Sequence, residues 1–184
     1  MSRKQLQRHG LSLTCLLIVT LAAPVIAANM RSFIEAVRRK APVVYLGSVK
    51  EVRELERTKF DLKARAVVSV IAVARGPETK PSEAIVDYSS YDDKTPMLAG
   101  GPQYRLRPGL NVVIFADAFE SRVPPGYLLQ GTREELLQAV VGLRDRLKQM
   151  SPDQLKVNEI NEDDRRVQLA LYDKLCAQLR STFR

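Results

Sequence analysis

The sequence predicts a mainly β fold with some α: a small antiparallel β-barrel of five or six strands, a short N-terminal helix and a C-terminal helical hairpin. Between residues 43 and 130, short apolar or alternating segments recur with turn residues between them and without helical crossovers. Beyond residue 131, apolar residues recur at helical spacing. Gly47 interrupts the first apolar segment, where a barrel strand has to bend sharply.

The N-terminus has the composition of a secretory signal peptide, which we place at residues 1–28. Basic residues precede an apolar segment at 11–23, and small residues permit cleavage after Ala27 or Ala28. An uncleaved membrane anchor is the alternative, but the apolar run is shorter than the roughly 20 residues of a spanning helix, and Pro24 interrupts its end. We therefore expect a periplasmic or secreted protein.

Removal of this segment leaves 156 of the 184 residues, which suffices for one domain. Three basic residues leave with it, so the formal net charge falls from +8 to +5. This modest charge is weak support for a nucleic-acid partner. We expect residues 29–131 to form the barrel and residues 132–184 to form helices packed on or beside it, with no membrane span after cleavage.

Cysteine and histidine usage restricts the chemistry of the mature chain. Cys176 is its sole cysteine, so an intramolecular disulfide is excluded, and its helical spacing predicts a buried side chain, with pairing between two chains as the alternative. The one histidine, His9, lies in the signal peptide. Ser-His-Asp and Cys-His nucleophiles and histidine-rich zinc sites are therefore excluded. We predict no catalytic residue, no cofactor and no metal.

The expected elements follow in chain order. Ser32 and Glu35 form a capping-box pattern that predicts a helix at 32–39. The first strand then begins at Pro42 and continues through Gly47, although a strand that ends just before the glycine is the alternative. Alternating or apolar runs between turns predict the later strands, at 60–75, 83–89, 103–107, 111–119 and 126–130.

Two helices are expected to close the chain. Thr132 and Glu135 form a second capping box. Apolar residues then recur at steps of three and four, first at Leu136, Val140, Leu143, Leu147 and Met150, and after Asp164 at Leu169, Tyr172, Cys176, Leu179 and Phe183. The acidic tract at 158–164 is interpreted as a helix start, because negative charge stabilises the first turn.

The strand series also resembles a known family. APVVYLGSVKEVRE, RAVVSVIAVARG, EAIVDYS and RLRPGLNVVIFADAF look like the strands of secreted barrels of the oligonucleotide/oligosaccharide-binding (OB) type, similar to the netrin module and the N-terminal domain of tissue inhibitors of metalloproteinases. The resemblance covers residues 30–130 and implies an OB-like barrel. Those inhibitors chelate zinc through an N-terminal cysteine, which this chain lacks, so only the architecture is carried over.

Two sets of residues are candidates for binding a ligand. Tyr88 and Tyr91 lie in an expected loop with three carboxylates, and Arg105 and Arg107 share one face of an expected strand. Together with Tyr45, these side chains could form a basic groove with aromatic stacking. The competing interpretations are a solvated loop and charges that merely face water.

The sequence favours an exported, non-enzymatic binding or assembly module that engages an unknown protein partner. A barrel that binds a glycan or a nucleic acid is the alternative. A histidine-free hydrolase is the second alternative; Ser48 and Lys50 lie near one another on an expected strand, which allows a Ser-Lys arrangement.

Overall fold

The structure is a computed structural model that describes residues 34–58, 61–91, 104–123 and 127–182. The predicted signal peptide lies outside the described residues. The chain divides into two units, Met1–Ala36 and Val37–Arg184, and the barrel and the C-terminal helices belong to the second. Residues 34–40 are helical, which confirms the described part of the helix expected at 32–39.

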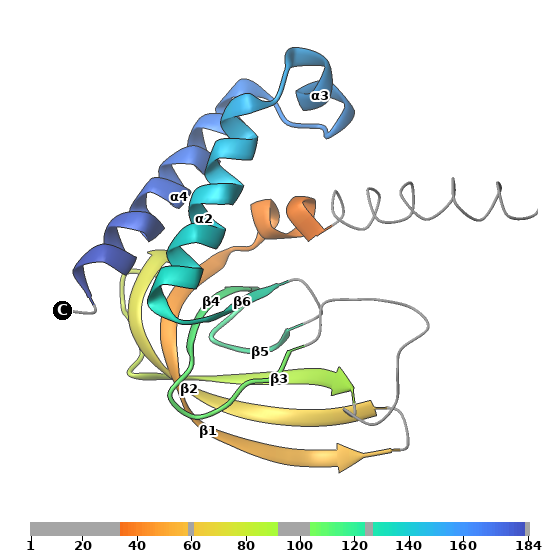
Figure 1. Ribbon diagram of the computed structural model, residues 1–184, viewed down its shortest axis with the longest axis vertical. Coiled ribbons are helices and arrows are strands. Elements are labelled where there is room, and N and C mark those ends of the chain that lie inside the picture. Colours follow the sequence, from red (N-terminus) through yellow and green to blue (C-terminus); the bar gives the residue numbers. More distant parts are fainter. Residues whose placement is uncertain (1–33, 59–60, 92–103, 124–126, 183–184) are drawn as a thin grey trace, which may run out of the picture. The chain divides into compact units, whose positions relative to one another are not determined.

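Six strands form one sheet that curls into a half-barrel (Figure 1), in the order β5-β3-β2-β1-β4-β6. Their bounds are β1 Val43–Arg57, β2 Asp61–Arg75, β3 Glu83–Tyr91, β4 Asn111–Ala116, β5 Glu120–Val123 and β6 Leu128–Gly131. Neighbouring strands are antiparallel, except that β3 and β5 run parallel. The predicted barrel with helices is confirmed at this level, and the parallel pair is a correction.

The prediction of a strand at 103–107 is wrong for its described residues, because residues 104–107 have no regular secondary structure. Tyr104 and Leu106 are buried in the barrel interior, whereas Arg105 and Arg107 are exposed. The alternation in the sequence therefore belongs to an irregular segment that lies over the barrel and points every second side chain into its interior. The sixth strand is instead β5, in a polar segment that follows β4.

The strands β1 and β2 approach each other closely at Gly47. A Cβ atom there would lie 2.4 Å from Val68 Cγ1 and 2.8 Å from the carbonyl oxygen of Ser69. The register between the strands shifts between Leu46 and Gly47, because Ile71 is an extra residue in β2 at this point. β1 then continues to Arg57, so the glycine permits a bend within the strand and does not end it.

Two hydrophobic cores lie on opposite sides of β1. Tyr45 and Val49 face the barrel interior, where they meet apolar residues of β2, β3 and β4. Val44 and Leu46 face the other way and pack against the C-terminal helices. Burial on both faces explains why the start of β1 is continuously apolar.

The C-terminal helices are α2 Arg133–Gln149, α3 Pro152–Val157 and α4 Glu162–Ser181. Thr132 and Glu135 form the expected capping box, and Asn161 caps α4, whose first turn carries the predicted acidic residues. Helices α2 and α4 form the expected hairpin. The short helix α3 between them was not predicted, although Ser151 and Gln154 give it a capping box of its own.

The hairpin covers one end of the sheet, and Cys176 of α4 is buried there, as expected. Burial raises the pKa of its thiol. The distal halves of β1 and β2 project away from the helices (Figure 1), so their outer side remains exposed. Within the described part of the chain, no helix is both long and apolar enough to cross a membrane.

Tyr45 provides a test of the barrel interior. Its hydroxyl is buried without a hydrogen-bond partner among the described residues, and burial raises its pKa. Because a buried hydroxyl without a partner is unfavourable, we expect Tyr45→Phe to raise the free energy of unfolding by about 1 kcal/mol in urea titrations. Tyr88→Phe is the matched control, since a backbone hydrogen bond from Leu106 satisfies that hydroxyl. It should lower the free energy of unfolding, and equal effects of the two variants would contradict the account.

Candidate functional site

The predicted ligand-binding residues differ in their exposure: Tyr88 is buried, whereas Arg105 and Arg107 are exposed. Tyr88 is only 4% exposed and packs edge-to-face against Tyr104 inside the barrel, with ring centroids 6.4 Å apart. The expected loop is a strand at this point, because β3 extends to Tyr91, whose side chain lies outside the described residues. Tyr88 therefore belongs to the core and cannot stack on a ligand at the surface.

Arg105 and Arg107 are exposed, whereas Tyr104 and Leu106, which alternate with them, are buried. The backbone N–H of Arg105 donates to Oε1 of Gln130, on strand β6, at 3.2 Å. Tyr45 faces the barrel interior, as Tyr88 does. The described tyrosines of the predicted groove, Tyr45 and Tyr88, are therefore buried, whereas its two arginines are exposed; the side chain of Tyr91 lies outside the described residues.

A different cluster of charges lies on the outer side of the sheet, where β1, β2, β3 and β5 run next to one another. Arg53 is paired with Arg65, Arg65 with Asp87, and Asp87 with Arg122. These four residues form one line across four strands, which we call the arginine row. Because paired residues on one face of a sheet have neighbouring side chains, the row is continuous in space.

The rows on either side have a different character. The next row lies two residues further along the strands and contains Glu51, Val67, Ile85 and Glu120, paired in the same way. Two aliphatic residues therefore lie between two carboxylates in this row. In the other direction, Glu56 is paired with Lys63, and Lys63 with Ser89. We call these three rows together the outer face. It carries four basic and four acidic side chains.

Hydrogen bonds within the outer face neutralise part of this charge. Arg65 donates from Nε and Nη2 to the two carboxylate oxygens of Asp87, at 2.7 and 2.8 Å. This bidentate contact lowers the pKa of the Asp87 carboxyl. Arg53 donates from Nε to Glu51 on its own strand, and Arg122 donates to the hydroxyl of Ser89 at 3.3 Å.

Arg53 and Arg65 lie directly opposite each other, and each is ion-paired with a carboxylate, Arg53 with Glu51 and Arg65 with Asp87. Like charges directly opposite each other in a sheet are destabilising. The side chain of Arg53 is 70% exposed and that of Arg65 is 46% exposed, so both guanidinium groups are accessible from solvent.

The Asp87 carboxylate gives the outer face a testable pH dependence. Its folded pKa is lowered by the Arg65 hydrogen bonds, so its stabilising effect is present above the ordinary carboxyl pKa of 3.8 and is lost as the pH falls through the lower folded value. We expect Asp87→Asn to be less stable than the unaltered protein at pH 7 and to approach it below pH 3.8. Urea titrations at pH 7, 5 and 3 measure this difference, and a gap that stays constant would contradict the contact.

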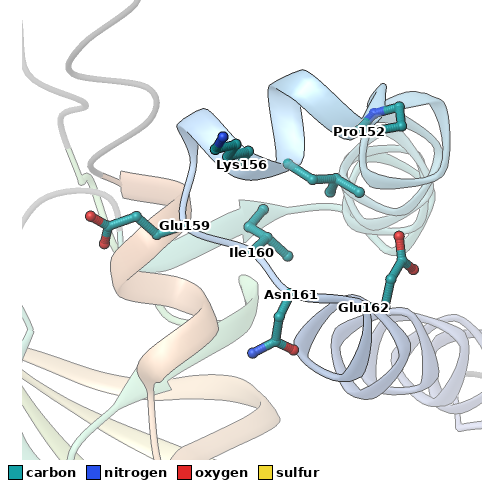
Figure 2. A pocket seen from close by; sticks show the side chains of 7 residues that line it. Pro152, Lys156, Glu159, Ile160, Asn161 and Glu162 are labelled. Carbon is teal, nitrogen blue, oxygen red and sulfur yellow. The ribbon is translucent and has the colours of Figure 1, made fainter.

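A second candidate is a shallow surface hollow of about 430 Å³ between α3 and the start of α4 (Figure 2). Ile160 points into it and Glu159 points away. Val157, at the end of α3, is 82% exposed, and Glu159 has a left-handed backbone with φ of 54°. The other lining residues are Pro152, Leu155, Lys156, Asn161 and Glu162. The hollow is open to solvent and mixes apolar, acidic and basic groups.

The described residues contain no group of three or more histidine, cysteine, aspartate or glutamate side chains placed to hold a metal ion. Sequence reasoning missed the outer face, although KEVRELER and DLKARA show its alternating charges. The pairing of Arg53 with Arg65 depends on the strand register, which the local pattern does not give. No family model matches the chain, and no curated protein matches it.

Proposed function

We propose that this chain is an exported, non-enzymatic module that binds another protein through its outer face. The observation that carries the proposal is the arginine row, in which Arg53 and Arg65 lie side by side on an exposed sheet surface. Arginine is enriched in protein interfaces, where its planar guanidinium forms directional hydrogen bonds.

The charge pattern of the outer face favours a protein over a polyanion. Its four basic side chains are matched by four acidic ones, among them Glu51 and Glu120 beside the arginine row. A nucleic acid or a sulfated glycan presents a uniform negative charge, which these carboxylates would repel. Val67 and Ile85 add an apolar contact that a protein surface can match. A protein partner with its own charge pattern therefore fits this face better.

Export is proposed from the sequence of residues 1–28. The resemblance to OB-like barrels supports only a scaffold that holds the binding face, and it names no partner. A hydrolase based on Ser48 and Lys50 is a weaker candidate. The Lys50 ammonium donates to a carboxylate oxygen of Glu83 at 2.5 Å, and among the described residues it makes no hydrogen bond to the Ser48 hydroxyl that it would have to activate.

The proposal is tested by partner recovery from the native envelope with two matched variants. Ile85→Arg places a bulky charge in the middle of the outer face, and Val157→Arg places the same charge on an exposed site beside the hollow. After gentle crosslinking, we expect one specific partner to be recovered at moderate salt with the unaltered protein and with Val157→Arg, and to be lost with Ile85→Arg.

Equal recovery with both variants, when both are folded by circular dichroism, would refute binding through the outer face. Mass spectrometry of the purified protein tests export at the same time. The proposal predicts a mature N-terminus at Ala28 or Asn29. Retention of Met1 in the envelope fraction would refute a cleaved signal peptide.

A further inference from the structure

We infer that the outer face binds an acidic segment of its partner protein, with partner carboxylates docked on Arg53 and Arg65. This inference rests on the proposed function and names the chemistry of the partner. It is carried by the geometry of the arginine row and by the hydrogen-bond donors that the row leaves uncommitted.

The donors are counted from the contacts of the row. A guanidinium has five N–H donors. In the described structure, Arg53 uses only Nε, toward Glu51, and Arg65 uses Nε and Nη2, toward Asp87. The Nη groups of Arg53 and Nη1 of Arg65 have no acceptor among the described residues, so they can donate to an arriving carboxylate without breaking a contact within the face.

The spacing of the row suits carboxylates. Directly paired residues have Cβ atoms about 5 Å apart, so a single carboxylate or two adjacent ones can contact both guanidinium groups. Val67 and Ile85 lie in the next row, about 7 Å away along the strands. The matching segment therefore has acidic and aliphatic side chains about 7 Å apart, two residues apart in a strand or one turn apart in a helix.

The neighbouring acidic residues restrict the choice of anion. Glu51, Asp87 and Glu120 surround the row, and a continuous phosphate backbone would pass over them. A short protein segment can place its carboxylates on the arginines alone and its aliphatic or basic residues over these acids. This patterned recognition distinguishes an acidic protein segment from a nucleic acid.

The test uses the purified protein and two synthetic peptides. The probe is acetyl-Gly-Glu-Ser-Val-Ser-Glu-Gly-amide, in which each glutamate is two residues from the valine and so lies on the same face of a strand. Its control has glutamine in place of every glutamate. NMR titration follows the Nε–Hε signals of the arginines. We expect the signals of Arg53 and Arg65 to shift with the glutamate peptide only, and the dissociation constant to rise at least about tenfold in the Arg53→Gln/Arg65→Gln variant.

Arg107→Gln is the matched control, because Arg107 is exposed but lies outside the outer face. It should leave the dissociation constant unchanged within about twofold, as expected of a charge outside the contact. Thermal unfolding of each variant verifies that it is folded. A glutamate peptide that binds the double variant as tightly as the unaltered protein would overturn the inference.

Two further outcomes separate this inference from the proposed function. If the glutamate peptide does not bind, yet partner recovery still depends on Ile85, the acidic partner is refuted and the protein-binding function stands. If partner recovery is also independent of Ile85, both are refuted. Tighter binding of a thymidine oligonucleotide than of the peptide, abolished in the double variant, would assign the row to nucleic acid and overturn the inference.

Discussion

Replacing Gly47 with alanine is expected to lower the free energy of unfolding by about 3 kcal/mol, because the added methyl group has no space. Its Cβ would lie 2.4 Å from Val68 Cγ1 and 2.8 Å from the carbonyl oxygen of Ser69. The valine could change its rotamer, but the carbonyl belongs to the backbone of β2. Relief therefore requires β1 and β2 to separate at the bend. Urea titration monitored by circular dichroism measures the loss.

Gly142→Ala is the matched control for this prediction. Gly142 lies within α2, and the nearest atom to an added Cβ is Arg146 Nη1 at 3.8 Å, which is an ordinary contact. Because alanine is more favourable than glycine in a helix interior, this variant should have a free energy of unfolding about 0.5 to 1 kcal/mol higher than that of the unaltered protein. If Gly47→Ala were as stable as Gly142→Ala, the proposed close approach of β1 and β2 would be wrong.

Replacing Leu175 with alanine is expected to lower the free energy of unfolding by about 3 kcal/mol, in the usual range for a fully buried leucine. Leu175 of α4 is 0% exposed and packs in the core between the helical hairpin and the sheet. Its truncation leaves a cavity that the rigid sheet cannot fill. A urea titration measures the effect.

Val167→Ala, in the same helix, is the control for the Leu175 variant. Its side chain is exposed, so its truncation removes little packing and should change the free energy of unfolding by less than about 0.5 kcal/mol. Similar losses for the two variants would mean that α4 does not pack on the sheet through Leu175, and that the two-core arrangement is incorrect.

The sequence predicts the helices and the glycine bend well because their signals are local. The capping box at Thr132 and the spacing of Leu136, Val140 and Leu143 are complete within a few turns of chain. Gly47 could be identified because a glycine within a buried strand commonly marks a bulge, a bend or the close approach of another backbone. Neither conclusion requires knowledge of which segments pair.

The parts that the sequence does not predict depend on long-range pairing. Residues 104–107 alternate as a strand does, but the alternation arises because Tyr104 and Leu106 fill the barrel interior. Strand β5 is short and polar, and its parallel pairing with β3 has no local signal.

The outer face also depends on long-range pairing between strands. Lys50 is an extra residue in β1, so the alternation of its side chains shifts and Glu51 and Arg53 join the face of Arg65. Counting every second residue from Tyr45 or Gly47 would place Glu51 and Arg53 in the barrel interior. A bulge therefore determines the candidate site, and the sequence does not show where the bulge lies.

The most direct test of the protein-binding face is site-specific photocrosslinking in the native envelope. A photoreactive amino acid is placed at Val67, in the outer face, or at Val157, beside the α3 hollow. The account predicts an adduct with one protein from position 67, lost when Arg53→Glu is added, and none of the same mass from position 157. The same adduct from position 157 alone would contradict it.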